Sequence, residues 1–233
     1  MIDRPLVAFL DVNETLSDLD SLTPAFEAAG LNAADVYPWY LAVLRDGFAA
    51  TVLGDCPRFA DLGAQVAAAR IRAVAEGLSD DEIATAAADL MSGFLRAQPH
   101  PDVVSGLVAL ADAGVRVVTL SNGSAAVARA LFESTAAATV VEEYLSVDDA
   151  GAWKPSPVAY RHGLGWAGID AADGLMVAVH PWDLEGARRV GLRTAWINRH
   201  GAVYPAGFTT PDIEATSFDD LARILTDGPT PQV

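Results

Sequence analysis

Residues 9–16 read FLDVNETL, and the residues just before them complete a short apolar run that ends at Asp11. An apolar run of this length is typical of a buried strand, and the polar residues that follow it are typical of a turn. Asp11 is therefore predicted at the carboxyl end of a strand, where open α/β sheets place their chemistry. Because Asn13 rather than a second acid follows two positions later, a nucleophile, a metal ligand and a helix cap all stay open for Asp11.

The part of the chain after residue 98 alternates between predicted helices and strands. The predicted strands are 116–120, about 140–147, 175–179 and 193–198, and the predicted helices are 102–114, 124–135, 156–168, 183–191 and about 217–226. Such alternation with short connections is typical of a parallel, doubly wound sheet. Residues 17–97 show helical spacing only. We therefore predict an α/β fold: a Rossmann-like, doubly wound parallel sheet formed by residues 1–16 and 98–233, with an inserted α-helical cap domain at 17–97.

The composition restricts the partners that we expect. Of the 233 residues 52% are hydrophobic, and the formal net charge of −16 argues against binding to nucleic acid, which needs a basic surface. No apolar run is long enough to cross a bilayer, and the first residues lack a signal peptide's pattern, so we expect no membrane partner and a cytoplasmic location. Cys56 is the single cysteine, which excludes an internal disulfide and a cysteine metal site.

Lys154 is unusual because the other 14 of the 15 basic residues are arginine. A single lysine suggests a place where a compact ammonium group is needed and a planar guanidinium does not fit. The alternative is a surface lysine that remained by chance.

Polar residues follow the predicted strands, whose carboxyl ends meet at one edge of a parallel sheet. They are Asp11 and Thr15 after the first strand, Ser121 and Asn122 after the second, Lys154 in a later loop, and His180 and Asp183 after the strand at 175–179. Each has a structural alternative: a helix cap for Ser121, Asn122 and Asp183, and a hydrogen-bonded strand end for His180. Together they predict a site with carboxylates, an ammonium group and hydroxyl and amide donors.

Four segments that contain these residues resemble the sequence motifs of the haloacid dehalogenase superfamily and, within it, of the type II L-2-haloacid dehalogenases. The segment DVNETL (11–16) is similar to their Asp-x-x-x-Thr-Leu motif, LSNGS (120–124) to the second motif, SVDDAGAWKPSPVAY (146–160) to the lysine segment and VAVHPWDLEGA (177–187) to the fourth. The segments AWINRHG (195–201) and TPDIEATSF (210–218) also resemble type II segments. The resemblance covers the predicted core and the position of the cap.

The resemblance implies a hydrolytic dehalogenation of small 2-haloalkanoic acids to 2-hydroxy acids. Asp11 would attack the carbon that carries the halogen, and water would hydrolyse the resulting ester. Thr15 would orient Asp11, and Lys154 would keep it ionised. Tyr160 would assist Lys154, and Asp183 would help to position the hydrolytic water.

The resemblance also implies a substrate site. Ser121 and Asn122 would hold the substrate carboxylate and line the halide region. We also place Trp39 of the cap in the pocket wall, and the alternative is a core residue. The arginine that usually follows this tryptophan is replaced by Tyr40, which we also place in the substrate site. Arg45, one turn further on, is predicted to contact the halide or the carboxylate, and the alternative is an exposed helix arginine.

Two positions argue against the magnesium-dependent phosphatases of the same superfamily. Phosphoryl transfer needs a metal with carboxylate ligands. Asn13, which we place in the substrate site, and Val179 stand where the phosphatase pattern has acids, so we predict no metal ion and no cofactor. His180, at the usual position of an asparagine, is predicted to position water or to act as a base.

Three functions therefore remain for the chain. The first is a metal-independent dehalogenase, acting on a small halogenated carboxylate. The alternatives are a magnesium-dependent phosphatase and a catalytically weak protein that binds a small carboxylate. A homodimer is expected from the family resemblance.

Overall fold

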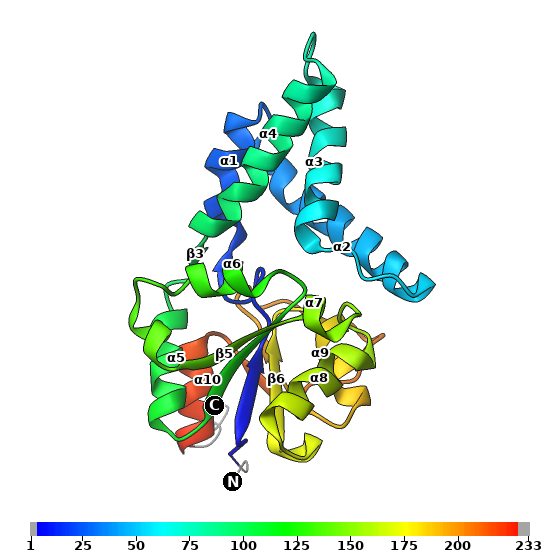
Figure 1. Ribbon diagram of the computed structural model, residues 1–233. Helices are drawn as coiled ribbons and strands as arrows, with labels where there is room; N and C mark the ends of the chain where they lie inside the picture. Colours follow the sequence, from blue (N-terminus) through cyan, green and yellow to red (C-terminus); the bar gives the residue numbers. More distant parts are fainter. Residues whose placement is uncertain (1–3, 228–233) are drawn as a thin grey trace.

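The computed structural model describes residues 4–227, and its centre is a parallel sheet (Figure 1). The strands of this sheet are β1 (Val7–Leu10), β4 (Arg116–Ser121), β5 (Val141–Ser146), β6 (Gly174–Ala178), β7 (Arg193–Ile197) and β8 (Ile213–Ala215). Their order is β5-β4-β1-β6-β7-β8, and every neighbouring pair is parallel. The predicted α/β fold with a doubly wound parallel sheet is confirmed.

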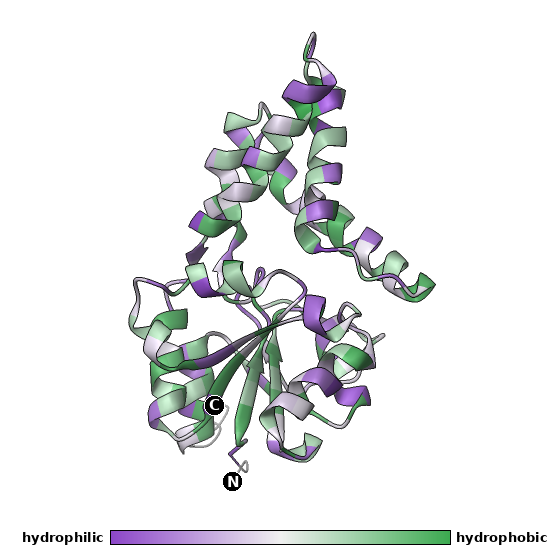
Figure 2. Cartoon of the chain, in the orientation of Figure 1, coloured by the Kyte–Doolittle hydropathy of each residue, from purple (hydrophilic) through white to green (hydrophobic). Residues whose placement is uncertain are grey.

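Helices cover both faces of the sheet. Helices α5 (Val103–Asp112) and α10 (Phe218–Asp227) pack together on one face, and α8 (Pro157–Ala167) and α9 (Pro181–Arg189) pack together on the other. Alternate residues of β1 point to opposite faces, so that Ala8 and Leu10 join one hydrophobic cluster while Val7 and Phe9 join the other. The central strands β1 and β6 accordingly consist largely of hydrophobic residues (green in Figure 2), which join clusters on both sides of the sheet.

A group of helices lies beyond the carboxyl ends of the strands (Figure 1). It contains α1 (Thr23–Ala28), α2 (Val36–Leu53), α3 (Phe59–Val74) and α4 (Asp80–Ser92). The chain enters and leaves this group through β2 (Ser17–Asp18) and β3 (Gln98–Pro99), which pair in antiparallel fashion. This pairing supports the predicted cap boundaries at 17 and 97, which stay a prediction. The outer ends of the predicted core, 1–3 and 228–233, lie outside the described residues.

Several short helices connect the longer elements. Helices α6 (Ala125–Ala130) and α7 (Val147–Ala150) follow β4 and β5, and the 3-10 helices are η1 (Leu19–Leu22), η2 (Ala33–Asp35), η3 (Gly93–Arg96), η4 (Ala136–Thr139) and η5 (Ala171–Asp173). The helix predicted at 124–135 is wrong in its length, because α6 ends at Ala130 and Ser134 and Thr135 favour a turn. Strand β8 was not predicted, since three residues between turn-forming segments show too little periodicity.

Candidate active site

The candidate site lies at the carboxyl end of β1, where the order of the strands proceeds in opposite directions on the two sides of β1. Strand β1 pairs with β4 on one side and with β6 on the other, so the carboxyl ends of these three strands are neighbours. Asp11 directly follows β1, Ser121 ends β4, and His180 comes two residues after β6. Open α/β sheets bind their ligands at such a switch point. The helices between β2 and β3 lie over this edge (Figure 1).

Lys154 forms the centre of the site. Its Nζ donates to Oδ1 of Asp11 at 2.8 Å and to Oδ2 of Asp183 at 2.7 Å, and its side chain is fully buried. Burial opposes the charge of Asp11, but Lys154 and His180 outweigh it and hold the pKa of the Asp11 carboxyl well below its usual range. Burial lowers the pKa of Lys154, but the charges of Asp11 and Asp183 outweigh burial, so the pKa is raised overall. The single lysine therefore keeps its charge beside an ionised aspartate.

His180 bridges two carboxylates. Its Nδ1 lies 3.0 Å from Oδ2 of Asp11, and its Nε2 lies 2.8 Å from Oε2 of Glu14. Burial disfavours the imidazolium, but the hydrogen bonds and charges of Asp11 and Glu14 outweigh burial and raise the pKa of His180 to about 9. In the free protein at neutral pH, His180 is an imidazolium that donates from both ring nitrogens.

Glu14 is a site residue that the sequence interpretation missed. Its backbone has φ of +68°, which is costly for a residue with a Cβ and is common only for glycine. This conformation accompanies the placement of its carboxylate on His180. The available signal was an acidic residue in the loop between Asp11 and Thr15.

Thr15 makes the two oxygens of Asp11 different. Its Oγ1 donates to Oδ2 of Asp11 at 2.6 Å and accepts from the backbone N–H of Val179 at 3.1 Å. Oδ2 thus accepts from Thr15 and His180, whereas Oδ1 accepts from Lys154. A carboxylate oxygen has about two lone-pair directions, so Oδ1 has one left for a reaction.

Tyr160 holds the second carboxylate. Its hydroxyl lies 2.7 Å from Oδ1 and 2.9 Å from the backbone carbonyl oxygen of Asp183. Burial and the charge of Asp183 raise the pKa of Tyr160 well above its usual value, so the phenol stays a neutral donor. The Asp183 carboxylate is therefore held between Tyr160 and Lys154.

Asn122 and Ser121 lie at the end of β4 beside Lys154. The Nδ2 of Asn122 donates to the carbonyl oxygen of Lys154 at 3.2 Å, and its Oδ1 accepts from the N–H of Lys154 at 2.9 Å. The Oγ of Ser121 accepts from the N–H of Gly123 at 2.8 Å. The Asn122 side chain thus positions the lysine backbone, and a contact of either residue with a substrate stays a prediction.

Tyr40 and Asn13 cover the site from the cap side. The ring centroid of Tyr40 lies 6.2 Å from that of His180, and its hydroxyl lies 3.5 Å from the carbonyl oxygen of Asn13. Burial and the charge of Asp11 raise the pKa of Tyr40 well above its usual value, which keeps the hydroxyl neutral. The structure brings both residues next to the predicted catalytic groups.

Two predicted cap residues lie elsewhere. Trp39 donates from Nε1 to the carbonyl oxygen of Gly63 at 2.9 Å and packs edge-on against Phe26, inside the helical group. The side chain of Arg45 is 73% exposed, and its Nε lies 2.8 Å from Oδ1 of Asp46. The structure does not bring Trp39 or Arg45 to the charged cluster.

The orientation of α2 explains the position of Arg45. The buried residues of this helix include Tyr40, Val43, Leu44 and Gly47, which form its inner face. Arg45 lies on the outer face, as does Leu41 one turn before it, which is 48% exposed. Arg45 therefore does not point to the side of α2 that carries Tyr40, where the type II pattern has its arginine.

Trp153, directly before Lys154, connects the helical group to the core. Its Nε1 donates to the carbonyl oxygen of Pro57 at 2.8 Å, and its backbone N–H donates to Oγ1 of Thr51 at 3.2 Å. Its ring stacks on Phe59 with a centroid distance of 5.8 Å. The position of the cap is thus coupled to the segment that carries the lysine.

Two cavities lie near the charged cluster, one lined by its neighbours Asn13 and Gly123 and the other by two of its members. A cavity of about 60 Å³ is lined by Asn13 and Gly123 of the core and by cap residues that include Arg58 and Phe59. A second cavity of about 340 Å³ lies on the side of Glu14 and His180. A third cavity, of about 670 Å³, lies between α1 and α4 inside the helical group.

The donor set does not fit a divalent metal ion. The ammonium group of Lys154 lies between the two carboxylates that such an ion would need, and Asn13 and Val179 supply no carboxylate. Within residues 4–227, no group of three or more His, Cys, Asp or Glu side chains is arranged to hold a metal ion.

Comparison with known proteins agrees with the motifs. A family model of haloacid dehalogenase-like hydrolases matches residues 6–191. Haloacetate dehalogenase H-2 of Moraxella sp. (strain B) is 35% identical over 136 residues, which are 58% of this chain and 61% of that protein. The match thus spans about three fifths of that relative's length.

Two further similarities extend over almost the whole chain. Enolase-phosphatase E1 of Streptomyces avermitilis is 31% identical over 91% of this chain and 95% of that protein. The structure of an L-2-haloacid dehalogenase from Xanthobacter autotrophicus shares the fold with a TM-score of 0.85 at 21% identity, covering 97% of this chain and 100% of that one. With its sheet topology and motif order, the chain belongs to the haloacid dehalogenase-like hydrolases.

Proposed function

We propose that the protein hydrolyses small 2-haloalkanoic acids to 2-hydroxy acids through an ester on Asp11 and without a metal ion. The observation that carries this proposal is the buried ammonium group of Lys154, 2.8 Å from Asp11 and 2.7 Å from Asp183. A buried carboxylate that a neighbouring charge keeps ionised is suited to nucleophilic attack. The similarity to a haloacetate dehalogenase supports the substrate class.

The first half of the reaction uses Oδ1 of Asp11, which has the free lone-pair direction. Oδ1 forms a bond to the carbon next to the substrate carboxylate, and the halide leaves with the electron pair of the carbon–halogen bond. Thr15 and His180 hold Oδ2, so the carboxylate cannot rotate away from the substrate. The product of this step is a neutral ester of Asp11.

The second half uses His180 as a base. Formation of the ester removes the negative charge of Asp11, which contributes to the raised pKa of His180 in the free protein. The pKa of His180 therefore falls, and the imidazolium releases its Nδ1 proton to solvent. The Nε2 proton stays on the ring because Nε2 donates it to Glu14. The neutral Nδ1 then faces the ester and can accept a proton from water.

The remaining steps restore the starting state. Water adds to the carbonyl carbon of the ester as His180 takes its proton, and the intermediate collapses to the hydroxy acid and the Asp11 carboxylate. The imidazolium is then again beside two carboxylates. One turnover consumes one water and releases one halide ion and one proton, so that atoms and charges balance.

The same charges support the proposal that the reaction needs no metal ion. Lys154 and His180 already compensate Asp11, and displacement of a fully buried ammonium group by a cation would leave that group without partners. A neutral carbon centre with a halide leaving group also lacks the anionic oxygens that magnesium neutralises in phosphoryl transfer.

The rival function is a magnesium-dependent phosphatase, which the similarity to an enolase-phosphatase favours. A catalytically weak carboxylate-binding protein is the third candidate. Halide release from chloroacetate and 2-chloropropionate in EDTA, and phosphate release from p-nitrophenyl phosphate with magnesium, distinguish them. We expect halide release that EDTA does not change. Magnesium-dependent phosphate release without halide release would contradict the proposal, and carboxylate binding without turnover would favour the third candidate.

The ester itself is tested by a single turnover in H₂¹⁸O with enzyme in excess. Because water attacks the carbonyl carbon of the ester, the ¹⁸O should enter Asp11 while the hydroxy acid receives an unlabelled carboxylate oxygen. Mass spectrometry of the peptide with Asp11 and of the product reads both positions. Label in the first product instead would mean that water attacks the substrate directly.

We also propose a cytoplasmic homodimer that does not bind nucleic acid. The net charge of −16 supports the last point. Within residues 4–227, no helix is both long and apolar enough to span a bilayer. Size-exclusion chromatography with light scattering tests the dimer.

A further inference from the structure

The charges of the cluster leave the substrate carboxylate without a compensating cation. The carboxylates of Asp11, Glu14 and Asp183 contact the two cations Lys154 and His180. With Asp183 ionised, the cluster has one excess negative charge before a substrate enters, and a 2-halo acid brings another. Burial and the charge of Asp11 accordingly raise the pKa of Asp183, against the opposing effect of Lys154. Burial of an uncompensated anion is costly. If the proposed function holds, a further cation must face the substrate.

Arg58 is the cation that lines the small cavity beside the cluster. This cavity of about 60 Å³ lies between the cap and the core, and Asn13 and Gly123 form part of its wall. Within residues 4–227, the side chain of Arg58 has no hydrogen bond or ion pair, although its backbone carbonyl oxygen accepts from Asp61 and Leu62. Its electrostatic neighbour is Asp148, which lines the same cavity. The Arg58 guanidinium is therefore available to an anion.

The other arginines of the cap are less suitable. Arg45, Arg70 and Arg72 form ion pairs with Asp46, Asp35 and Asp80. Arg96 lines the cavity between α1 and α4, away from the charged cluster.

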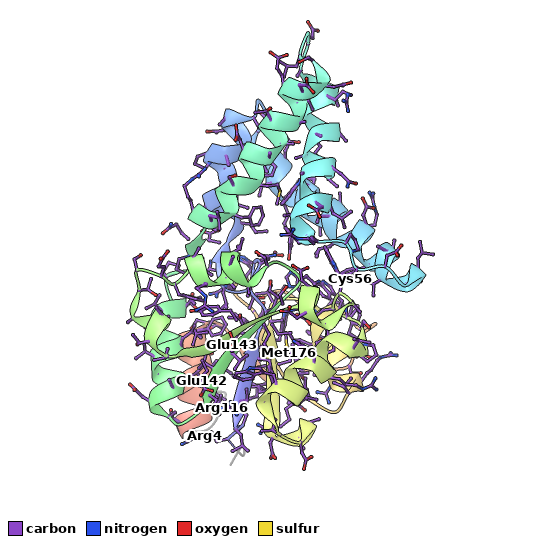
Figure 3. All side chains as sticks on the ribbon, viewed as in Figure 1. Arg4, Cys56, Arg116, Glu142, Glu143 and Met176 are labelled. Carbon is purple, nitrogen blue, oxygen red and sulfur yellow. The ribbon has the colours of Figure 1, made fainter. Side chains whose placement is uncertain are left out.

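The residues on both sides of Arg58 are anchored to the core. The carbonyl oxygen of Pro57 accepts from Trp153, and Phe59 stacks on the same indole ring. Nearby, Cys56 lies where the loop between α2 and α3 meets α7 (Figure 3), with its Sγ 3.6 Å from the carbonyl oxygen of Val147. Because Lys154 follows Trp153, these contacts hold the Arg58 backbone in a fixed relation to the catalytic lysine.

We infer that Arg58 binds the substrate carboxylate in the cavity between cap and core and thereby determines the preference for small 2-halo acids. The guanidinium presents two parallel N–H groups to a carboxylate, which fixes its orientation as well as its charge. Without substrate, Asp148 attracts this guanidinium, and a bound carboxylate would compete with Asp148 for it. Arg58 is thus a specificity residue rather than a group that takes part in bond changes.

Steady-state halide release from chloroacetate by Arg58→Gln tests this inference. We expect KM to rise about tenfold or more while kcat changes by less than about threefold, because a charge-assisted contact to the carboxylate is lost. Arg58→Lys keeps the charge and should raise KM by less than about threefold. Arg45→Gln is the matched control, since it removes an exposed cap arginine that is bound to Asp46, and its KM should equal that of the wild type.

A second test does not depend on turnover. Calorimetry measures the dissociation constant of chloroacetate for the Asp11→Asn variant, which cannot form the ester. In this background Arg58→Gln should weaken binding about tenfold, and Arg45→Gln should not. Were the wild type to release no halide, the proposed function would fail, while these dissociation constants would still test Arg58. Unchanged KM and Kd in Arg58→Gln, or equal losses in Arg58→Gln and Arg45→Gln, would overturn the inference. Thermal unfolding checks that each variant is folded.

Discussion

At the scale of single residues, the site is a chain of alternating charges in which Asp11 lies between Lys154 and His180. The two cations bind different oxygens of the carboxylate and hold its pKa well below the usual range. The arrangement keeps a buried carboxylate ionised, as the proposed role of Asp11 as a nucleophile requires.

Replacement of Asp11 by asparagine should therefore abolish the reaction. We expect the rate of halide release in Asp11→Asn to fall by about 10³-fold or more, because the amide oxygen is a poor nucleophile and no ester can form. Ion chromatography of the released halide measures it. Circular dichroism of the variant should match the wild type, and substantial halide release by a folded variant would exclude the ester mechanism.

Replacement of His180 should separate the two halves of the reaction. In His180→Gln, Asp11 and Lys154 still form the ester, but the base for its hydrolysis is missing. We expect a burst of about one halide per active site, followed by slow turnover, and intact-protein mass spectrometry should detect the ester. Glu14→Gln should show a milder form of this effect. Steady halide release at the wild-type rate by His180→Gln would assign the base elsewhere.

At the scale of elements, α2 and the segment before Lys154 are in contact at Gly47. A Cβ built on Gly47 would lie 2.3 Å from Cζ3 of Trp153, which is closer than real side chains approach. Because Trp153 directly precedes Lys154, a shift of α2 would reach the backbone of Lys154 through one peptide bond. The glycine thus lets the cap approach the core.

Gly47→Ala should destabilise the protein even though alanine is the better helix former. Helix propensity alone predicts a gain of about 1 kcal/mol, whereas the clash predicts a loss of about 1–3 kcal/mol. We expect a lower midpoint of thermal unfolding and a lower kcat, because Trp153 and Lys154 must move. Ala49→Ser, at an exposed position of α2, is the control and should change neither value. A stabilised Gly47→Ala variant would show that the indole can move aside without cost.

At the scale of the whole molecule, the imidazolium of His180 couples folding to pH. Its pKa is raised from 6.5 to about 9 in the folded protein, so its contribution is complete below pH 6.5 and is lost as the pH rises through about 9. The unfolding midpoint of the wild type should fall between pH 6.5 and 9.5, and His180→Gln should show a smaller fall. Differential scanning fluorimetry in a pH series measures both, and parallel curves would mean that His180 is not charged in the folded state.

Much of the fold could be predicted because its signals are local. The apolar run before Asp11, the alternation after residue 98 and the helical spacing of 17–97 each report the structure of one segment. Strand β8 and the end of α6 could not be predicted, because three residues of strand and the last turn of a helix show little periodicity. Their structure depends on neighbours that the sequence pattern does not identify.

The sequence by itself determined that Asp11, Lys154 and Asp183 meet, because parallel strands bring their carboxyl ends to one edge whatever the side chains between them. The tertiary structure alone decided which nearby groups complete the site. Glu14 reaches His180 through a left-handed backbone conformation, and Arg58 rather than Arg45 lines a cavity beside the cluster. These contacts depend on loop conformation and on the rotation of α2 over the sheet, which are set by packing between segments far apart in the chain.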